Sequence, residues 1–245
     1  MTLVSVWKEK ISSVLPWKVK WKLKRIREEW RVWWSSSDLM NLARIYKTDK
    51  WRHLYPPIYE QWFGHLRTKD VRLLEIGVGG YGRVWKGGES LRMWKKFFPH
   101  GKITGIDIFD KSIFQESRIR IYQGDQSDKQ FLHDISRKEG PFDIVVDDGS
   151  HLQSHIITSF EALFPLMPAG GTYVIEDTQT SYWSNYEGST HEMDTVTSAM
   201  NYFIQRIHAV NRKEWIKDEL KNDLPDEGIA SIAFYHNLIF IRKST

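Results

Sequence analysis

Apolar and amphipathic segments alternate along the chain from residue 71 to residue 177, and this rhythm limits the fold more than any other feature. Short apolar runs that end in glycine or acidic residues are typical of buried strands, whereas the segments between them have helical periodicity. The alternation predicts a mostly parallel sheet covered by helices on both faces. The predicted strands are VRLLEIGV (71–78), KITGIDIF (102–109), RIRIYQGD (118–125), FDIVVDD (142–148) and GTYVIED (171–177), and the predicted helices span 90–98, 127–138 and 152–167.

The pattern changes after residue 180. Residues 195–221 have a periodicity that predicts one long helix, and IASIAFYHNLIFIRK (229–243) predicts two strands that turn at His236 and Asn237. A parallel sheet that finishes in an antiparallel hairpin makes the expected fold class α/β and Rossmann-like. Because 245 residues is an ordinary length for one α/β domain with additions, residues 38–245 are assigned to a single domain.

Residues 1–37 are assigned to a separate, basic and tryptophan-rich helical extension. Residues 1–34 hold nine Lys and Arg against three Glu, a net charge of +6; the whole chain has +4, so the remainder has −2. One helical face is predicted from the spacing of Val19, Leu23, Ile26, Trp30 and Trp33.

Three roles are open to this helix. It could lie on an anionic membrane surface, pack on its own domain or on a partner subunit in a homo-oligomer, or bind nucleic acid. No recognisable nucleic-acid-binding module accompanies the lysines, so no nucleic-acid partner is expected.

The composition excludes several kinds of chemistry. The chain has no cysteine, which rules out disulfides, thiolate-bound zinc, a cysteine nucleophile and iron–sulfur clusters. Any metal must therefore be bound by oxygen or imidazole. No run of about 18 apolar residues occurs, as a membrane-spanning helix would need, and no secretory apolar core is present. We expect a cytoplasmic protein, with any membrane contact made peripherally at the inner membrane through residues 1–34.

The first predicted strand ends in LLEIGVGGYG, where Gly77, Gly79 and Gly82 have the spacing G-x-G-x-x-G. Glycines directly after a strand allow a tight turn that approaches a nucleotide or nucleoside closely. The motif fits NAD as well as S-adenosylmethionine (SAM). Glu75 could order the turn or receive the amino end of an amino-acid ligand, and the next helix begins only near Ser90, which leaves a longer loop than a pyrophosphate site needs. Both features favour SAM.

Two further strand ends extend the predicted cofactor site. Asp107 ends the second strand, where a carboxylate can bind ribose hydroxyls, and Asp125 and Gln126 follow the third, where they can frame an adenine. Ligands of open α/β sheets bind outside the carboxyl ends of the strands. Successive strand ends of this kind therefore predict a ligand site at one edge of the sheet.

The fourth and fifth predicted strands end in carboxylates, in DIVVDDGSH (143–151) and YVIED (173–177). If these strands are neighbours, Asp148, Glu176 and Asp177 converge on one edge of the sheet. Three carboxylates so close would raise one another's pKa unless a cation lay among them. An all-oxygen site suits Mg²⁺ better than zinc, so these three residues are the predicted magnesium ligands.

His151 follows Asp148 by three residues and should begin the helix after the fourth strand. An imidazole titrates near neutral pH and can accept a proton from a substrate hydroxyl. His151 is therefore the predicted general base, and capping or metal ligation is the alternative role. Asp147 is expected to support the cofactor site.

Several motifs together resemble a known family: the class I, SAM-dependent and Mg²⁺-dependent sugar O-methyltransferases of the macrolide type, such as the mycinamicin deoxysugar enzymes. The resemblance covers roughly residues 41–245, and DDGSH with YVIED is its most specific part. That family also has a sizeable N-terminal auxiliary domain, whereas a short tryptophan- and lysine-rich segment precedes the resemblance here, and Tyr81 stands where many methyltransferases have a third glycine. The motifs are TDKWRHLY, LLEIGVGG, GGESLRMWKKFFP, GIDIFDKS, GDQSD, DDGSH and LFPLMPAGGTYVIEDTQTSYW.

The resemblance implies a class I methyltransferase sheet and a role for each residue of the site. It implies that His151 is the general base and that the metal is held by Asp148, Glu176 and Asp177. The cofactor-binding residues predicted from the sequence and the resemblance together are Glu75, Gly77, Gly79, Gly80, Ser90, Asp107, Asp125, Gln126 and Asp147.

The sequence therefore predicts a SAM-dependent O-methyltransferase. Its expected acceptor is a sugar hydroxyl on a glycan, a lipid-linked saccharide or a glycosylated natural product, as in polysaccharide or antibiotic biosynthesis. Mg²⁺ would bind the acceptor diol. The alternatives are a metal-dependent methyltransferase of a catechol-like molecule, an NAD-dependent Rossmann oxidoreductase, and a membrane or nucleic-acid adaptor that uses the basic helix.

Overall fold

A computed structural model describes residues 16–33, 38–191, 198–214 and 228–245 of the chain. These residues fall into two compact units, Met1–Gly64 and His65–Thr245. The boundary predicted from composition, between residues 37 and 38, adjoins a stretch outside the described residues and stays a prediction. Among the described residues, no helix has the length and apolar content needed to cross a membrane.

The elements that the structure describes in the first unit are all helices. They are α2 (Trp17–Trp33), α3 (Leu39–Tyr46), the 3-10 helix η1 (Asp49–Trp51) and α4 (Tyr55–Phe63). The α3 helix begins where the Asp38 carboxylate accepts a hydrogen bond from the backbone N–H of Asn41, and it ends at Lys47 in the left-handed conformation. A short polar cap followed by a left-handed terminal residue is a common way to satisfy helix ends.

The predicted amphipathic helix is present as α2. Its described apolar side chains are exposed: Leu23, Ile26 and Trp30 have relative exposures of 52%, 55% and 62%, and Val19 is exposed as well. The side chain of Trp33 lies outside the described residues. In the part of α2 that the structure describes, Leu23, Ile26 and Trp30 thus have more than half of their surface exposed.

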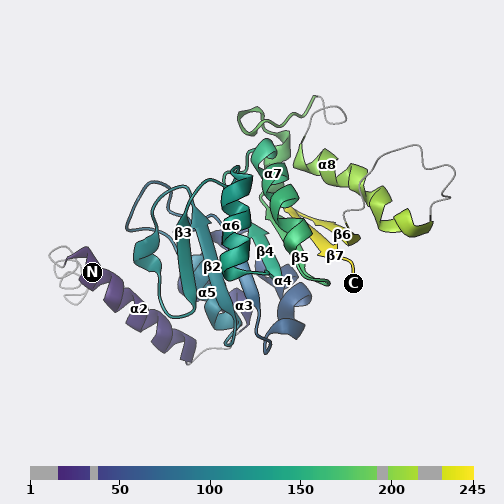
Figure 1. Cartoon of the computed structure of the whole chain (residues 1–245). Helices are drawn as coiled ribbons and strands as arrows, with labels where there is room; N and C mark the ends of the chain where they lie inside the picture. Colours follow the sequence, from purple (N-terminus) through teal and green to yellow (C-terminus); the bar gives the residue numbers. More distant parts are fainter. Residues whose placement is uncertain (1–15, 34–37, 192–197, 215–227) are drawn as a thin grey trace. The chain divides into compact units, whose positions relative to one another are not determined.

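The second unit contains a seven-stranded sheet in the order β3-β2-β1-β4-β5-β7-β6 (Figure 1). The first five strands in sequence are parallel, and β7 is antiparallel to β5 and β6. The strands are β1 (Arg72–Ile76), β2 (Lys102–Asp107), β3 (Ile119–Gln123), β4 (Ile144–Asp147), β5 (Thr172–Glu176), β6 (Ile229–Tyr235) and β7 (Leu238–Lys243).

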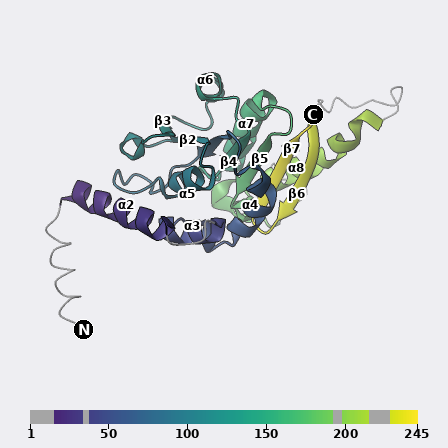
Figure 2. The ribbon, with the colours of Figure 1, turned by 90° about the horizontal axis from the view of Figure 1, so that it is seen from below.

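Helices cover both faces of this sheet. Figure 2 shows α6 and α7 on one side and α5 on the other. The α-helices are α5 (Glu89–Phe97), α6 (Lys129–Glu139), α7 (Gln153–Leu163) and α8 (Ala199–Arg206); the 3-10 helices are η2 (Gly64–Leu66), η3 (Ser112–Phe114), η4 (Phe164–Leu166), η5 (Thr178–Tyr182), η6 (Ser184–Tyr186) and η7 (Ile207–Glu214). The predicted α/β fold class, with a C-terminal antiparallel pair, is confirmed.

The hydrophobic core of the second unit lies between the sheet and the α6, α7 and α8 helices. Phe160 of α7 is at its centre, with its ring centroid 4.7 Å from Phe164, 4.8 Å from Phe203 and 5.3 Å from Tyr173. All four side chains are buried. Burial of aromatic side chains is among the largest stabilising contributions to a fold, so this core holds α7 against β5 and α8.

The C-terminal prediction was right for the hairpin and wrong for the preceding helix. The β6 and β7 strands are joined at His236 and Asn237, and Asn237 has a left-handed φ of 59°. The α-helix expected over 195–221 ends at Arg206 and continues only as the 3-10 helix η7; residues 192–197 and 215–227 lie outside the described residues. Ile207 and Val210 are exposed, so these two apolar side chains do not form the buried face that would favour an α-helix there.

Candidate active site and metal centre

The carboxyl ends of β1, β4 and β5 lie side by side. Ile76 pairs with Asp147, and Asp147 pairs with Ile175. The backbone N–H of Asp148 donates to the carbonyl of Ile76 at 3.0 Å, so the pairing extends one residue further. This register brings the glycine turn after β1 next to the acidic ends of β4 and β5.

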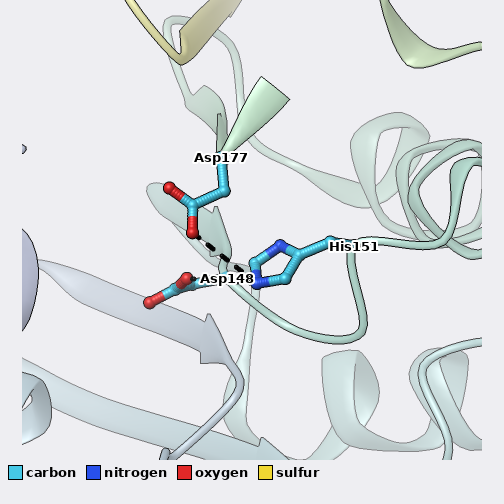
Figure 3. Close-up of side chains that lie close together, drawn as sticks. All are labelled: Asp148, His151 and Asp177. Carbon is cyan, nitrogen blue, oxygen red and sulfur yellow. Dashed lines mark ion pairs between the residues drawn. The ribbon is translucent and has the colours of Figure 1, made fainter. Parts of the chain in front are cut away.

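In the part of the chain that the structure describes, two groups of side chains could hold a cation. Asp148, His151 and Asp177 form one, and Glu75, Asp148 and Glu176 form the other; within each group the ligand atoms lie within 4.8 Å of one another. The Nε2 atom of His151 is 4.0 Å from Asp148 Oδ1 and 3.8 Å from Asp177 Oδ2. Figure 3 shows the imidazole pointing toward both carboxylates. Asp148 is shared by the two groups.

His151 and Asp177 both have left-handed backbone conformations, with φ of 59° and 54°. Residues other than glycine rarely adopt this conformation, and each such residue costs about 1–3 kcal/mol. The surrounding structure must therefore hold both residues in place. Strained residues gather at functional sites, and here they bear the predicted base and a predicted metal ligand.

Glu75 lies beside two other carboxylates. The structure buries it within 4.8 Å of Asp148 and Glu176, and its predicted role at the glycine turn or at the amino end of a ligand stays a prediction. β1 lies between β2 and β4 in the sheet, so a side chain near its end can reach the end of β4. Glu75 thus groups with Asp148 and Glu176, whereas Asp177 groups with Asp148 and His151; the predicted ligands Asp148, Glu176 and Asp177 are divided between the two groups.

The glycine turn adjoins this cluster directly. Gly77, Gly79 and Gly80 have φ of 92°, 84° and 80°, a region that glycine adopts without steric cost. A Cβ atom on Gly77 would lie 2.1 Å from the carbonyl oxygen of Asp148. Only glycine allows this approach, which places the turn against the backbone that bears a predicted metal ligand.

The other predicted cofactor residues lie around the turn. Asp107 accepts hydrogen bonds from the backbone N–H groups of Val78 and Phe109, each at 2.9 Å, and so holds the start of the turn. Asp125 accepts from the N–H of Ser127, which lowers the pKa of its carboxyl. Ser90 is half-buried in the first turn of α5.

Gln126 and Asp147 are occupied inside the protein rather than at its edge. The Gln126 amide donates to Asp147 Oδ1 at 3.1 Å and accepts from the backbone N–H of Ser150 at 2.7 Å. Ser159 and Tyr173 donate their hydroxyl groups to Asp147 Oδ2. Burial raises the pKa of Asp147. Both residues therefore support the loop that bears Asp148 and His151, and their predicted contact with the cofactor stays a prediction.

Sequence reasoning missed Gln153 and Tyr186, which lie next to His151, and Trp183, which lies next to Tyr186. Gln153 is fully buried and donates to the His151 carbonyl at 3.0 Å and to Thr180 Oγ1 at 3.2 Å. The Tyr186 ring lies 6.3 Å from the His151 ring, and Trp183 lies 5.9 Å from Tyr186, as centroid distances. The signal in the sequence was a pair of aromatic residues shortly after an acidic strand end.

The chemistry of the donor set fits the predicted ligands. A cluster of carboxylates with one imidazole suits a hard divalent cation such as Mg²⁺. The left-handed glycines, with Asp107 holding the start of their turn, fit a nucleoside at the carboxyl edge of the sheet. The same edge therefore offers adjacent sites for a metal and for a SAM-type cofactor.

Comparison with known proteins gives close relatives. Mycinamicin VI 2''-O-methyltransferase of Micromonospora griseorubida is 45% identical to this chain over 209 residues, which are 84% of this chain and 52% of that enzyme. Demethylmacrocin O-methyltransferase of Streptomyces fradiae is 42% identical and matches 84% of this chain and 53% of its own length. 8-Demethyl-8-alpha-L-rhamnosyl tetracenomycin-C 2'-O-methyltransferase of Streptomyces olivaceus is also 42% identical, and the match covers 84% of this chain and 54% of that enzyme. No protein-family model matches the chain.

A solved structure has the same fold. The MycE methyltransferase from the mycinamycin biosynthetic pathway, in complex with Mg and SAH, superposes with a TM-score of 0.79 at 44% identity over 84% of this chain and 53% of that one. The chain thus spans about half the length of the curated relatives it matches. Over 84% of its own length, the chain is a homologue of the sugar O-methyltransferases of macrolide and tetracenomycin glycosides, and it shares their fold.

Proposed function

We propose that this chain is the catalytic part of a SAM-dependent O-methyltransferase that methylates a sugar hydroxyl with the help of Mg²⁺. The observation that carries the proposal is the pair of side-chain groups sharing Asp148 at the ends of β1, β4 and β5. The relatives support it by their activities, and the MycE structure supports it because that enzyme is in complex with Mg and SAH.

Each residue has a part in the proposed mechanism. Mg²⁺ would be held by Asp148, Glu176 and Asp177, and when bound it would lower the pKa of a hydroxyl in the acceptor diol. Glu75 lies close to Asp148 and Glu176, and its negative charge would strengthen the binding of a divalent cation at this site. SAM supplies the methyl group from its sulfonium, and the neutral thioether of SAH leaves with the electron pair of the broken sulfur–methyl bond. His151 receives the hydroxyl proton at Nε2, the atom that faces Asp148 and Asp177.

In this proposal, most of the rate enhancement of methyl transfer comes from alignment of the methyl donor with the acceptor hydroxyl. Two partners held next to each other react as if their effective concentration were very high. The glycine turn and the acidic strand ends lie on one edge of the sheet, so one rigid element positions both. The loop that bears His151 is held by Gln126 and Gln153, which keeps the base in one place.

The decisive experiment measures methyl transfer from labelled SAM to deoxysugar, polysaccharide and catechol acceptors, with and without EDTA. We expect transfer to a glycoside that EDTA abolishes and Mg²⁺ restores. Activity that survives complete removal of metal would contradict the mechanism. Transfer to catechols and to no glycoside would contradict the acceptor class.

Peripheral membrane contact is a finer proposal that rests on α2. Its exposed Leu23, Ile26 and Trp30 lie on a helix that also bears Lys20, Lys22 and Arg27. A basic helix with an apolar face can bind at the surface of an anionic bilayer. Homo-oligomer formation, a cytoplasmic location and the absence of a nucleic-acid partner stay predictions.

This contact is tested by replacing Leu23, Ile26 and Trp30 together with Ser in the full chain. We expect the wild-type protein to co-sediment with phosphatidylglycerol vesicles and not with phosphatidylcholine vesicles, and the variant to remain in the supernatant with both. Equal sedimentation of wild type and variant would rule out α2 as the membrane contact.

A further inference from the structure

We propose that Lys111 is a positioning residue for the cofactor, because its ammonium group holds the loop between β1 and α5 in the shape that binds SAM. This loop comprises residues 77–88 and is named the cofactor loop. The inference rests on the proposed function and extends it: Lys111 acts on cofactor affinity through the loop.

The side chain of Lys111 is fully buried and ends among backbone carbonyl groups of the cofactor loop. Its Nζ atom donates hydrogen bonds to the carbonyls of Tyr81 at 2.5 Å, Arg83 at 3.0 Å and Lys86 at 3.1 Å. A lysine ammonium has three N–H donors, so these three carbonyls engage all of them. Hydrogen bonds from a charged donor are stronger than those between neutral groups.

The part of the cofactor loop that Lys111 binds is exposed to solvent. Residues 77–88 form neither helix nor strand, and residues 81–86 are all exposed. Such a segment gains little stability from apolar burial, so its order depends on polar contacts. The carbonyls bound by Lys111 extend from the first residue of this exposed stretch, Tyr81, to its last, Lys86.

The backbone of Lys111 is itself held in place. Its carbonyl accepts a hydrogen bond from the Phe114 N–H at 3.0 Å in the η3 helix, and the Phe114 side chain is buried. A Cβ atom on Gly88, at the end of the cofactor loop, would lie 3.1 Å from the Cβ of Phe114. The segment that bears Lys111 therefore packs against the loop that its ammonium binds.

Two carboxylates favour the charged form of Lys111. Burial lowers the pKa of its ammonium, whereas the negative charges of Asp107 and Glu89 act in the opposite direction. Asp107 also accepts a hydrogen bond from the Val78 N–H near the start of the cofactor loop. Asp107 thus holds the first residues of the loop and Lys111 its middle, and both act from the carboxyl end of β2 and the segment after it.

The cofactor loop is closed on itself at two glycines and open at a third. A Cβ atom on Gly80 would lie 2.4 Å from the Lys86 carbonyl oxygen, and one on Gly87 would lie 2.7 Å from the Gly79 carbonyl oxygen. A Cβ on Gly79 would meet no described atom beyond its chain neighbours within 4 Å. A ligand can therefore approach at Gly79, and binding to a loop that is already ordered loses less entropy.

The experiment replaces Lys111 by Met in the full chain, which keeps an unbranched side chain and removes the charge and the donors. Isothermal titration gives the Kd for SAH, and hydrogen–deuterium exchange without ligand reports the order of the loop. We expect the Kd to rise about 10–100-fold, the range for loss of one hydrogen bond to a charged group. Exchange should rise in residues 78–88 and stay unchanged in β4 and β5.

Initial rates separate positioning from general destabilisation. In Lys111→Met the KM for SAM should rise more than kcat falls, because saturating SAM orders the loop by its own binding. Lys111→Gln keeps an amide donor on a shorter side chain, so its Kd for SAH should lie between those of wild type and Lys111→Met. If Lys111→Met does not fold, Lys111→Gln decides.

Lys102→Met is the matched control, since it removes the same charge from an exposed position at the other end of β2. It should change neither the Kd for SAH nor exchange in the loop, and a rise equal to that of Lys111→Met would assign the effect to net charge and overturn the proposal. An unchanged Kd in the Lys111 variants would overturn the positioning role, even with lower stability or faster exchange. A wild type that binds no SAH would overturn the proposed function itself.

Discussion

At the scale of single residues, the site is organised around Asp148. Its carboxylate belongs to both candidate ligand groups, with His151 and Asp177 on one side and Glu75 and Glu176 on the other. The three carboxylates of the second group, Glu75, Asp148 and Glu176, repel one another strongly unless a cation balances their charge. A bound cation would therefore stabilise the group more than it would stabilise any one of its carboxylates alone.

Replacement of His151 by Ala tests the base. The imidazole is near Asp148 and Asp177 but is not part of the glycine turn, so the Kd for SAM should stay within error. Turnover with a glycoside should fall by about 10²–10⁴-fold, as is usual when a general base is removed. Isothermal titration with SAM and initial-rate measurements give both values.

A second variant serves as the control for this test. His133 lies on α6, away from the acidic edge, and His133→Ala should change neither value. Loss of SAM affinity in His151→Ala would instead assign His151 to the cofactor site.

At the scale of elements, the contact between the glycine turn and β4 decides whether the site forms. Gly77 and Gly79 have similar left-handed φ, but a Cβ on Gly77 meets the Asp148 carbonyl at 2.1 Å and a Cβ on Gly79 meets nothing within 4 Å. Gly77→Ala should therefore lose far more activity and stability than Gly79→Ala. The left-handed conformation alone costs each variant about 1–2 kcal/mol.

Urea denaturation and SAM titration of the two glycine variants measure this difference. The excess loss in Gly77→Ala reports the displacement of the Asp148 backbone. Equal losses in the two variants would mean that the turn does not depend on its contact with β4.

The contact between β3 and α6 gives a pH-dependent prediction. The Tyr122 hydroxyl donates to the Glu139 carboxylate, and burial, together with this acceptor, raises the pKa of Tyr122 to about 12 from 10.0. The folded state thus retains a proton that the unfolded state loses. Stability from this group is full below pH 10 and is lost as pH rises toward 12.

Urea midpoints at about pH 9, 10 and 11, which bracket the unfolded-state pKa of a tyrosine, test this prediction. The wild type should lose more stability over this range than Tyr122→Phe, which has no proton to release. Glu139→Gln keeps the phenol and removes the charge, so its loss should lie between the two. Parallel curves for wild type and Tyr122→Phe would show that Tyr122 titrates alike in both states.

The strands and the acidic edge could be predicted from the sequence because they depend on local pattern. Buried parallel strands are apolar runs, and their carboxyl ends share an edge. The position of Glu75 could not be predicted, since it requires knowing that β1 lies beside β4. Two aromatic residues after the acidic strand end were visible in the sequence, but the place of Tyr186 beside His151 was not, because it depends on two 3-10 turns and on the buried Gln153. The end of α8 could not be predicted either, because the apolar periodicity of the sequence does not show that Ile207 and Val210 are exposed.

At the scale of the whole molecule, the chain corresponds to about half of its relatives. The matched half contains the sheet, the glycine turn and the acidic edge, so it should bind cofactor by itself. SAH at a hundredfold excess over its Kd should stabilise the fold by about 2.7 kcal/mol. That corresponds to a rise in Tm of roughly 5–10 °C.

Thermal unfolding with SAH, with NAD and without ligand measures this rise. We expect no change with NAD, because the loop between β1 and α5 is longer than a pyrophosphate site needs. A rise with NAD and none with SAH would favour the oxidoreductase alternative.

The β6–β7 turn reaches the acidic edge because β7 runs antiparallel to β5. There the Asn237 carbonyl accepts a hydrogen bond from the Thr178 N–H at 3.3 Å, one residue beyond Asp177. Hairpin tips tolerate insertion and substitution far better than the strands they join. Evolution can therefore reshape the rim of the site at His236 and Asn237 while the strand pairing that holds the carboxylates stays untouched. Sequence variation can thus collect in the β6–β7 turn, while the paired strands of the same sheet keep the carboxylates in place.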